Sequence, residues 1–219
     1  MVAIDGPSGA GKGTVARLLA QALGFQYLDT GALYRAVALG LRKRGVSPSD
    51  PDETISQALK GITIELRGES VLLDGEDVSE AIRTKEAGHY SSVFSARRPV
   101  REFLLPLQRK MAQEHDLVAE GRDTTTVVFP RAWRKFYLDA SPQERARRRY
   151  QQLLQAGLKI SLQDALEDVL RRDERDSSRA LAPLRKSPDA IYIDTTRLSP
   201  QQVVRLMLKH IRGSHVQAD

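Results

Sequence analysis

The stretch Val2-Ala3-Ile4-Asp5-Gly6-Pro7-Ser8-Gly9-Ala10-Gly11-Lys12-Gly13-Thr14 decides the fold. It begins as a short apolar run that ends at Asp5, which is typical of a buried parallel strand. A glycine-rich turn follows. Residues 14 to 23 then carry apolar side chains at i, i+3, i+4 and i+7, the spacing of an amphipathic helix. A strand, a glycine-rich turn and a helix in this order predict an α/β fold.

The turn at residues 6 to 14 matches the pattern of a phosphate-binding loop, the name we use for it below. Its glycines let backbone N–H groups face phosphate oxygens, and the following helix adds the partial positive charge of its N-terminus. Lys12 is placed to reach the terminal phosphates of ATP. We expect ATP contacts from the whole loop: Gly6, Pro7, Ser8, Gly9, Ala10, Gly11, Lys12, Gly13 and Thr14.

One position of the loop narrows the class of protein. Gly13 stands where such loops usually carry Ser or Thr, and Thr14 follows it. The ending Gly-Lys-Gly-Thr resembles the nucleoside monophosphate kinases more than GTPases or motor ATPases. In those kinases Mg²⁺ is held largely by phosphates and water. Glu120 at a strand end is then the candidate for orienting the water ligands of the metal, although it could instead cap a turn.

Further apolar runs predict the other strands of the sheet, at residues 24–28, 117–119, 135–138 and 190–193. Helical patterns lie between them, with start signals at Ser141–Glu144, Ser161–Asp164 and Ser199–Pro200. Strands that alternate with helices predict a five-stranded parallel sheet covered on both faces, a three-layer α/β/α arrangement.

Residues 60 to 84 depart from this alternation. The segments 61–67 and 70–75 alternate like strands, and Gly68-Glu69 is short enough to connect them as an antiparallel hairpin. We expect a small β subdomain inserted into a single domain that spans residues 1 to 219.

The composition limits the remaining classes of protein. The 219 residues include 41% hydrophobic side chains and no cysteine, which excludes disulfides and thiolate metal sites. Without a signal sequence or a long apolar run, we expect a soluble cytoplasmic protein that does not bind membranes. The net charge of +6 leaves nucleic-acid binding open, but aromatic residues make up only 5% and do not interleave with the basic ones.

Transfer of a phosphoryl group between nucleotides needs cations from several directions. Arg35 and Arg122 both follow predicted strand ends. Arg172, Asp176 and Arg179 lie at i, i+4 and i+7 of a predicted helix, so they share one face. These two arginines and the aspartate could hold a phosphate and a sugar hydroxyl. Taken alone, these residues are better explained as a solvated face with weak ion pairs.

Taken in order, several segments together resemble bacterial cytidylate kinase, over residues 2 to about 210. They are residues 4–14, Asp29-Thr30-Gly31-Ala32-Leu33-Tyr34-Arg35, Gly75-Glu76-Asp77-Val78 with Ile82-Arg83, Glu120-Gly121-Arg122-Asp123, residues 126–130, Arg172-Asp173-Glu174-Arg175-Asp176 and Leu181-Ala182-Pro183-Leu184. This ordered set is far more specific than the phosphate-binding loop alone.

The resemblance implies transfer of a phosphoryl group from ATP, with Mg²⁺, to CMP and dCMP by a monomer that does not bind nucleic acid. It implies cytosine contacts from Ser92, Arg101 and Asp123, acceptor-phosphate contacts from Arg35, Arg122 and Arg179, and ribose contacts from Arg172 and Asp176 with Thr30 nearby. An aspartate acceptor suits the exocyclic amine of cytosine. It also implies a lid at residues 145–160, in which Arg145 and Arg148 contact ATP, and catalysis by Lys12, Arg122, Arg172 and Arg179.

One departure from the family concerns Thr124-Thr125, where relatives usually carry an apolar residue and then glycine. If that glycine has a positive φ, Thr125 is expected to be strained. Two alternative functions stay open: a kinase for UMP or another small acceptor such as a hydroxy acid, and an ATPase that binds nucleic acid.

Overall fold

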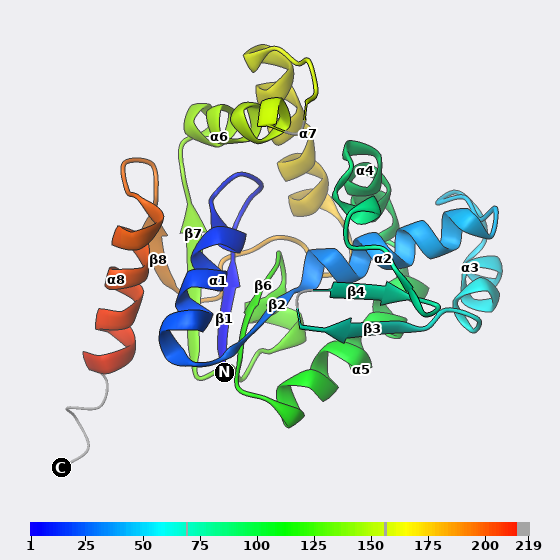
Figure 1. Ribbon diagram of the computed structural model, residues 1–219, viewed down its shortest axis with the longest axis horizontal. Coiled ribbons are helices and arrows are strands. Elements are labelled where there is room, and N and C mark those ends of the chain that lie inside the picture. The colour runs from blue at the N-terminus through cyan, green and yellow to red at the C-terminus, as the bar shows by residue number, and fades with distance from the viewer. Residues whose placement is uncertain (69, 156, 214–219) are drawn as a thin grey trace. The chain divides into compact units, whose positions relative to one another are not determined.

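The computed structural model describes residues 1–68, 70–155 and 157–213 (Figure 1). The chain divides into two compact units. The first contains Met1–Leu28, Ala112–Ser178 and the chain from Ala182 onward, and the second contains Asp29–Met111 and Arg179–Leu181. Each unit has its own β-sheet. No helix of the described residues is both long and apolar enough to cross a membrane.

The first unit is built on a five-stranded parallel sheet, as the apolar runs predicted. In spatial order its strands are β2 (Gln26–Asp29), β6 (Leu117–Glu120), β1 (Val2–Asp5), β7 (Arg134–Asp139) and β8 (Ile191–Asp194). The register pairs Ile4 with both Glu120 and Phe136. The carboxyl ends of β1, β6 and β7 therefore lie together, where ligands of open parallel sheets bind.

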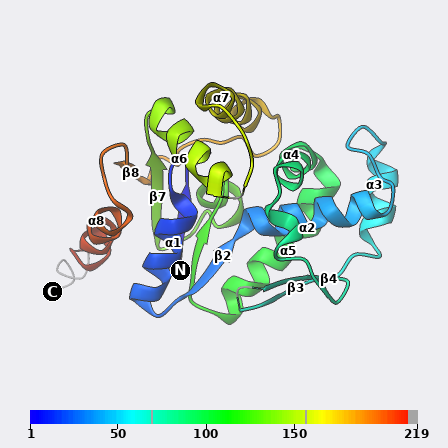
Figure 2. The same ribbon diagram turned by 45° about the horizontal axis from the view of Figure 1, so that its top comes forward.

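Helices α1 (Lys12–Leu23) and α8 (Pro200–Arg212) pack against each other beside this sheet (Figures 1 and 2). Their apolar faces join the strands in one buried core, in which Ile4, Leu19, Phe136 and Met207 have no exposed surface. The other helices of this unit, α6 (Pro142–Gln155) and α7 (Leu162–Ser178), also pack against each other. A π turn spans Thr124–Val128.

The predicted helix starts are confirmed, and a serine side chain caps each of them. Ser199 Oγ accepts from the Gln202 amide at 3.3 Å, and Gln202 Oε1 accepts from the Ser199 amide at 2.7 Å, a complete capping box. The same exchange joins Ser161 and Asp164 before α7. At α6 Ser141 Oγ accepts from the Glu144 amide at 3.3 Å, but the carboxylate of Glu144 accepts from arginines of its own helix.

The second unit contains the predicted hairpin and one further strand. Strands β3 (Ile64–Arg67) and β4 (Ser70–Leu73) pair antiparallel, and β5 (Glu76–Asp77) pairs with β4. Asp74 and Gly75 have φ of 52° and 83°, so they form the tight turn that Asp-Gly favours. The prediction missed this turn because it continued the second strand to residue 75. Glu69, half of the predicted connection, lies outside the described residues.

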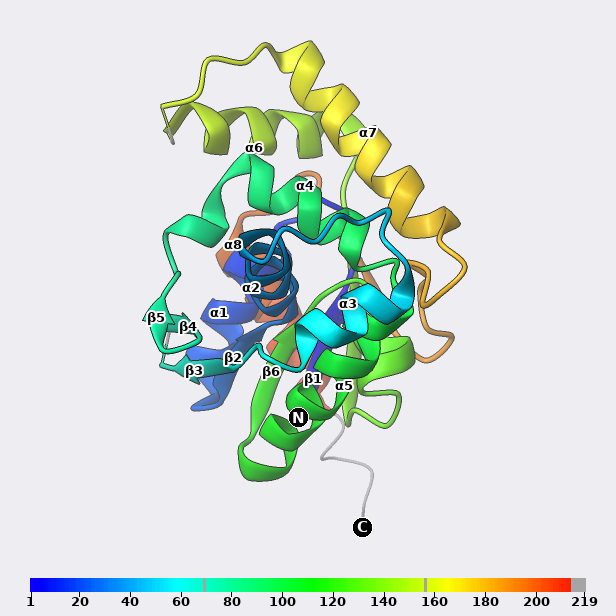
Figure 3. The same ribbon diagram turned by 90° about the vertical axis from the view of Figure 1, so that its right-hand side faces the viewer.

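Besides its small sheet, the second unit contains several helices and a 3₁₀ turn. They are α2 (Thr30–Lys43), α3 (Asp52–Leu59), a 3₁₀ turn at Ala81–Arg83, α4 (Lys85–Phe94) and α5 (Arg98–Glu114), the last of which continues beyond this unit after Met111. Figure 3 shows α2 end-on, and α4 and the small sheet contact it. A Cβ at Gly40 of α2 would lie 2.9 Å from Ile62 Cδ1, so glycine at this position allows Ile62 to pack closely against the helix.

Candidate active site

The backbone of the phosphate-binding loop depends on glycine at three positions. Gly6 has a φ of 150°, and a Cβ there would lie 1.9 Å from the carbonyl oxygen of Leu138. Gly9 and Gly11 have φ of 78° and 86°, which side chains rarely allow. Gly11 is the N-cap of α1, and no side chain among the described residues makes a capping hydrogen bond there. The loop thus presents backbone N–H groups at a helix N-terminus, which favours anion binding.

Lys12, the first residue of α1, is buried, with 5% of its surface exposed. Its Nζ donates to the carbonyl oxygen of Pro7 at 2.9 Å. Burial, followed by the positive charges of Arg122 and Arg172, lowers the pKa of Lys12 from 10.5 to about 7, while Glu120 acts in the opposite direction. An anion at this amine would restore its proton affinity.

Glu120 lies beside the first turn of α1. A Cβ on Gly13 would lie 3.4 Å from both Glu120 Oε1 and Tyr27 Oη, and Tyr27 Oη is itself 3.4 Å from that carboxylate. Glycine in place of the usual hydroxyl residue therefore leaves room for a carboxylate next to the phosphate-binding loop. One carboxylate here fits a Mg²⁺ ion whose ligands are phosphates and water, because it can accept hydrogen bonds from the water ligands.

Arg122, Arg172 and Asp176 are together in the first unit. Arg122 Nε donates to Asp176 Oδ2 at 2.9 Å, and Arg172 Nε lies 4.0 Å from the same oxygen. Burial disfavours the charge of Arg122, but the carboxylates of Asp176 and Glu120 outweigh it and raise its pKa above the ordinary value. The shared helix face predicted for residues 172 and 176 is thus a site of cation–carboxylate contact, not a solvated face.

The two arginines predicted to contact ATP are engaged within the first unit. Arg145, 6% exposed, donates to the carbonyls of Ala140 and Ser8 at 2.9 and 3.2 Å and contacts Asp173. Arg148 donates to Glu144 and to Thr195. Their contacts with ATP stay a prediction.

Asp173 is a residue that the sequence analysis missed. Its Oδ1 accepts from the Ser8 amide at 3.1 Å, and Arg145 donates to the Ser8 carbonyl, so residues of α7 and α6 together hold the backbone of the phosphate-binding loop. Its only signal in the sequence is its position between Arg172 and the rest of the acidic–basic run.

The expected strain at Thr125 is wrong. Among the non-glycine residues described, positive φ occurs at Asp74 and Ala182 only. The segment instead forms the π turn Thr124–Val128, whose first amides donate to the carboxylate of Asp5. Asp123, which precedes the turn, is 5% exposed.

In the second unit, Asp29 organises the start of α2. Its Oδ1 accepts from the Ala32 amide at 2.9 Å, and its Oδ2 forms an ion pair with Arg35 at 2.8 Å. Thr30, the first residue of the helix, is 5% exposed. Arg35 is therefore held at the N-terminal end of α2, where the helix dipole also favours an anion.

Ser92, Arg101 and Arg179 all meet one residue of the second unit, Ser95. Arg179 Nη1 donates to Ser95 Oγ at 3.3 Å, Arg101 Nη1 donates to the Ser95 carbonyl at 3.0 Å, and Ser95 Oγ donates to the Ser92 carbonyl at 2.8 Å. The buried Oγ of Ser92 has no hydrogen-bond partner among the described residues. Sequence reasoning missed Ser95, although it lies one helical turn after Ser92. The predicted acceptor residues are divided between the two units: Thr30, Arg35, Ser92, Arg101 and Arg179 belong to the second, and Arg122, Asp123, Arg172 and Asp176 belong to the first.

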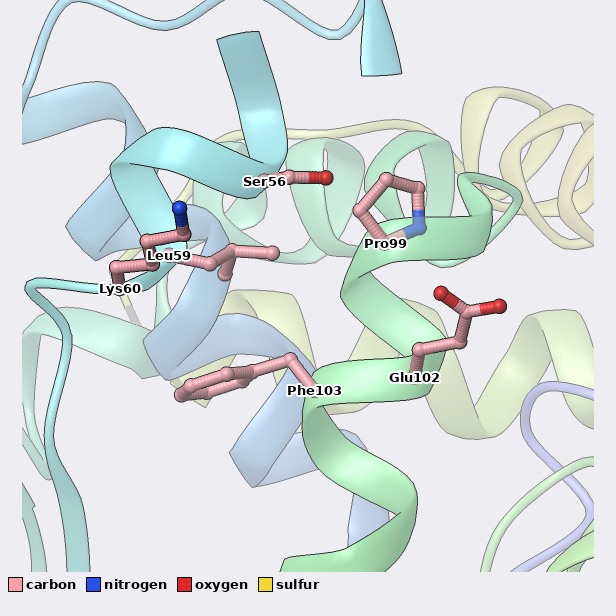
Figure 4. Close-up of a pocket in the computed structure, with 6 residues that line it drawn as sticks. All are labelled: Ser56, Leu59, Lys60, Pro99, Glu102 and Phe103. Atoms are coloured by element: carbon pink, nitrogen blue, oxygen red, sulfur yellow. The ribbon is translucent and has the colours of Figure 1, made fainter. Parts of the chain in front are cut away.

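A pocket on the second unit is separate from these groups (Figure 4). Helices α3 and α5 line it with Ser56, Leu59, Lys60, Pro99, Glu102 and Phe103. None of the predicted site residues is among them, and its lining offers no cluster of cations for a polyphosphate.

Comparisons with known proteins agree with this arrangement. A family model described as cytidylate kinase matches residues 2–213. A cytidylate kinase of Thermodesulfovibrio yellowstonii is 55% identical over 215 residues, which cover 96% of this chain and 97% of the relative. One of Citrifermentans bemidjiense is 46% identical and covers 100% and 95%. A solved structure of an uncharacterized protein from Eubacterium ventriosum shares the fold at a TM-score of 0.55 and 13% identity, over 96% of this chain and 97% of that one. The family inferred from the ordered motifs is confirmed, and the chain belongs to the cytidylate kinase family.

Proposed function

We propose that this chain transfers the γ-phosphoryl group of ATP to CMP, and also to dCMP, to give ADP and the cytidine or deoxycytidine diphosphate. Identity of 55% over nearly the whole length to a cytidylate kinase is the observation that carries this proposal. The cations that influence one another in the first unit, Lys12, Arg122 and Arg172, support it because they suit polyanionic substrates.

ATP binds at the phosphate-binding loop. Backbone amides of the loop and the N-terminus of α1 receive the β-phosphate, while Lys12 neutralises the terminal oxygens. Mg²⁺ bound with ATP would neutralise phosphate charge, and Glu120 is the residue that would orient its water ligands. Arg145 and Arg148 of the lid at residues 145–160 contribute further contacts. Residue 156 of that lid lies outside the described residues.

CMP is recognised through its base, its phosphate and its sugar. Asp123 accepts a hydrogen bond from the exocyclic amine of cytosine, whereas the carbonyl of uracil would face the same carboxylate lone pair to lone pair. The free Oγ of Ser92 and the guanidinium of Arg101 supply the other contacts to the base. Arg35, Arg122 and Arg179 bind the acceptor phosphate, and Thr30, Arg172 and Asp176 lie at the ribose.

The chemistry requires alignment and neutralisation of charge. An oxygen of the CMP phosphate attacks the γ-phosphorus of ATP, and the bond to the bridging β–γ oxygen breaks with ADP as leaving group. No general base is needed, since the attacking oxygen is already anionic. Lys12, Arg122, Arg172 and Arg179 stabilise the charge that spreads over the transferred group.

An acceptor panel tests the proposal directly. The purified chain is assayed with MgATP and CMP, dCMP, UMP, AMP or shikimate, and we expect the highest kcat/KM for the cytidine nucleotides. Turnover of UMP, AMP or shikimate comparable to that of CMP would contradict it. Stimulation of ATP hydrolysis by nucleic acid, with a steep salt dependence, would point to the alternative class.

Asp123→Ala tests the base contact within the same panel. We expect it to reduce the CMP-to-UMP ratio of kcat/KM while ATP affinity stays unchanged, because the lost acceptor faces the base and not the donor nucleotide. A ratio equal to that of the wild type would remove the role proposed for Asp123.

A further inference from the structure

Asp5 and Thr125 form a buried contact that the mechanism above does not use. Asp5 has no exposed surface, and Thr125 is 1% exposed. Asp5 Oδ1 accepts from the Thr124 amide at 2.8 Å, and Oδ2 accepts from the Thr125 amide at 2.7 Å and from Thr125 Oγ1 at 2.6 Å. A buried carboxylate is costly unless donors satisfy it, so this set of contacts strongly favours one backbone geometry.

The contact joins two segments that carry different parts of the reaction. Asp5 ends β1 and immediately precedes Gly6 of the phosphate-binding loop. Thr125 lies two residues after Asp123 and three after Arg122. Both segments belong to the first unit. The contact therefore sets the distance between the loop that receives ATP and the residues assigned to the acceptor.

The geometry of Asp123 depends on the same π turn. Its carbonyl oxygen accepts from the amides of Val127 and Val128 at 2.8 and 3.1 Å. The turn is thus held from both ends, by the Asp5 carboxylate on its first amides and by the Asp123 carbonyl on its last. Movement of Thr125 away from Asp5 would turn the peptide that carries the Asp123 side chain.

We propose that the Thr125 hydroxyl is a positioning group, which through Asp5 fixes Asp123 and Arg122 relative to the phosphate-binding loop and thereby sets the preference for a cytosine acceptor. This inference rests on the proposed function, because it assigns base recognition to Asp123. Thr125 touches neither nucleotide and acts through the turn.

Thr124 supplies a matched control. It is also 1% exposed, but no hydrogen-bond partner for its Oγ1 is found among the described residues. Thr124→Val and Thr125→Val therefore make the same change of shape one residue apart, and only the second removes a donor from Asp5. Thr125→Ser keeps that donor and loses a methyl group.

The experiment compares these variants in kcat/KM for CMP and UMP and in the Kd for ATP. We expect Thr125→Val to reduce kcat/KM for CMP by about tenfold, the scale of one hydrogen bond to a charged group. The CMP-to-UMP ratio should fall with it, while the Kd for ATP stays within about twofold because the loop itself is intact. Thr125→Ser and Thr124→Val should behave as the wild type. An unchanged CMP-to-UMP ratio in Thr125→Val, or an equal loss in Thr124→Val, overturns the proposal.

Amide hydrogen exchange separates failure of this inference from failure of the proposed function. The amides of Val127 and Val128 should exchange about tenfold faster in Thr125→Val than in the wild type or Thr125→Ser. If the wild type shows no preference for CMP, the proposed function fails, and base selection through Thr125 fails with it. If the Val127 and Val128 amides still exchange faster in Thr125→Val, the structural link from Thr125 to the turn is retained. If their exchange is unchanged, that link fails as well.

Discussion

ATP binding above neutral pH should take up nearly one proton at Lys12. In the absence of nucleotide, burial and the charges of Arg122 and Arg172 hold the pKa of this amine at about 7 instead of 10.5. At pH 8, one unit above that value, about one amine in eleven is protonated. Phosphate oxygens next to the amine favour the ammonium form, so the bound state is protonated almost completely. The expected uptake is about 0.9 proton at pH 8 and about 0.1 at pH 6.

Isothermal titration calorimetry measures this uptake directly. The observed enthalpy of MgATP binding, plotted against the ionisation enthalpy of several buffers at pH 8, has a slope equal to the number of protons taken up. Lys12→Arg is the control, since a guanidinium keeps its charge throughout this range and should give a slope near zero. A wild-type slope near zero at pH 8, or the same slope in Lys12→Arg, would refute the reasoning.

The same pKa has a consequence for stability. The folded-state pKa of about 7 lies below the unfolded value of 10.5, so the unfolded chain holds more protons between these two pH values. The wild type should therefore become more stable as pH rises from about 7 to 10.5. Lys12→Met should raise the free energy of unfolding most below pH 7, and its advantage should vanish near pH 10.5.

Three other changes test contacts described above. Ser95→Ala should raise the KM for CMP about tenfold without changing the Kd for ATP, because it removes the hydroxyl that Arg179 contacts in the second unit; a change in both constants would contradict this. Arg145→Met leaves the carboxylate of Asp173 without its cation and should lower the free energy of unfolding by about 3 kcal/mol, measured by urea denaturation. Gly40→Ala should lower the free energy of unfolding by about 1–3 kcal/mol, because the added Cβ would make close contacts. Gly88→Ala in helix α4 should raise it by about 0.5–1 kcal/mol in the same assay, because the added Cβ would have no neighbouring atom within 4 Å.

The parts of the fold that local patterns encode could be predicted from the sequence. Buried parallel strands are continuous apolar runs, so the five of them could be located, and the serines before α6, α7 and α8 mark helix starts. The short strand β5 was missed because its residues, Glu76 and Asp77, are exposed and carry no apolar pattern. The Asp74-Gly75 pair is the available signal, because it indicates a turn within residues 70–75, which the alternating pattern predicts as one strand.

The candidate site also contains some features that local sequence patterns predict and others that they do not. The phosphate-binding loop is contiguous in sequence, so spacing alone identifies it. The contacts of Ser8 with Asp173, of Asp5 with Thr125 and of Ser95 with Arg179 join residues 165, 120 and 84 positions apart. No local period relates such residues. Thr125 illustrates the difficulty, since its departure from the family pattern was visible but its partner was not.

Lys12 and Arg122 are neighbouring cations whose pKa values shift in opposite directions. Both are buried near Glu120, but only Arg122 has a carboxylate in direct contact, Asp176 at 2.9 Å. That contact keeps the guanidinium charged before any ligand arrives. The amine of Lys12 donates to a neutral carbonyl instead, and burial together with the charge of Arg122 lowers its pKa, so an incoming phosphate can raise that pKa again. The cluster therefore carries less charge to keep buried before ATP binds, and its charge rises when the phosphates that need it are present.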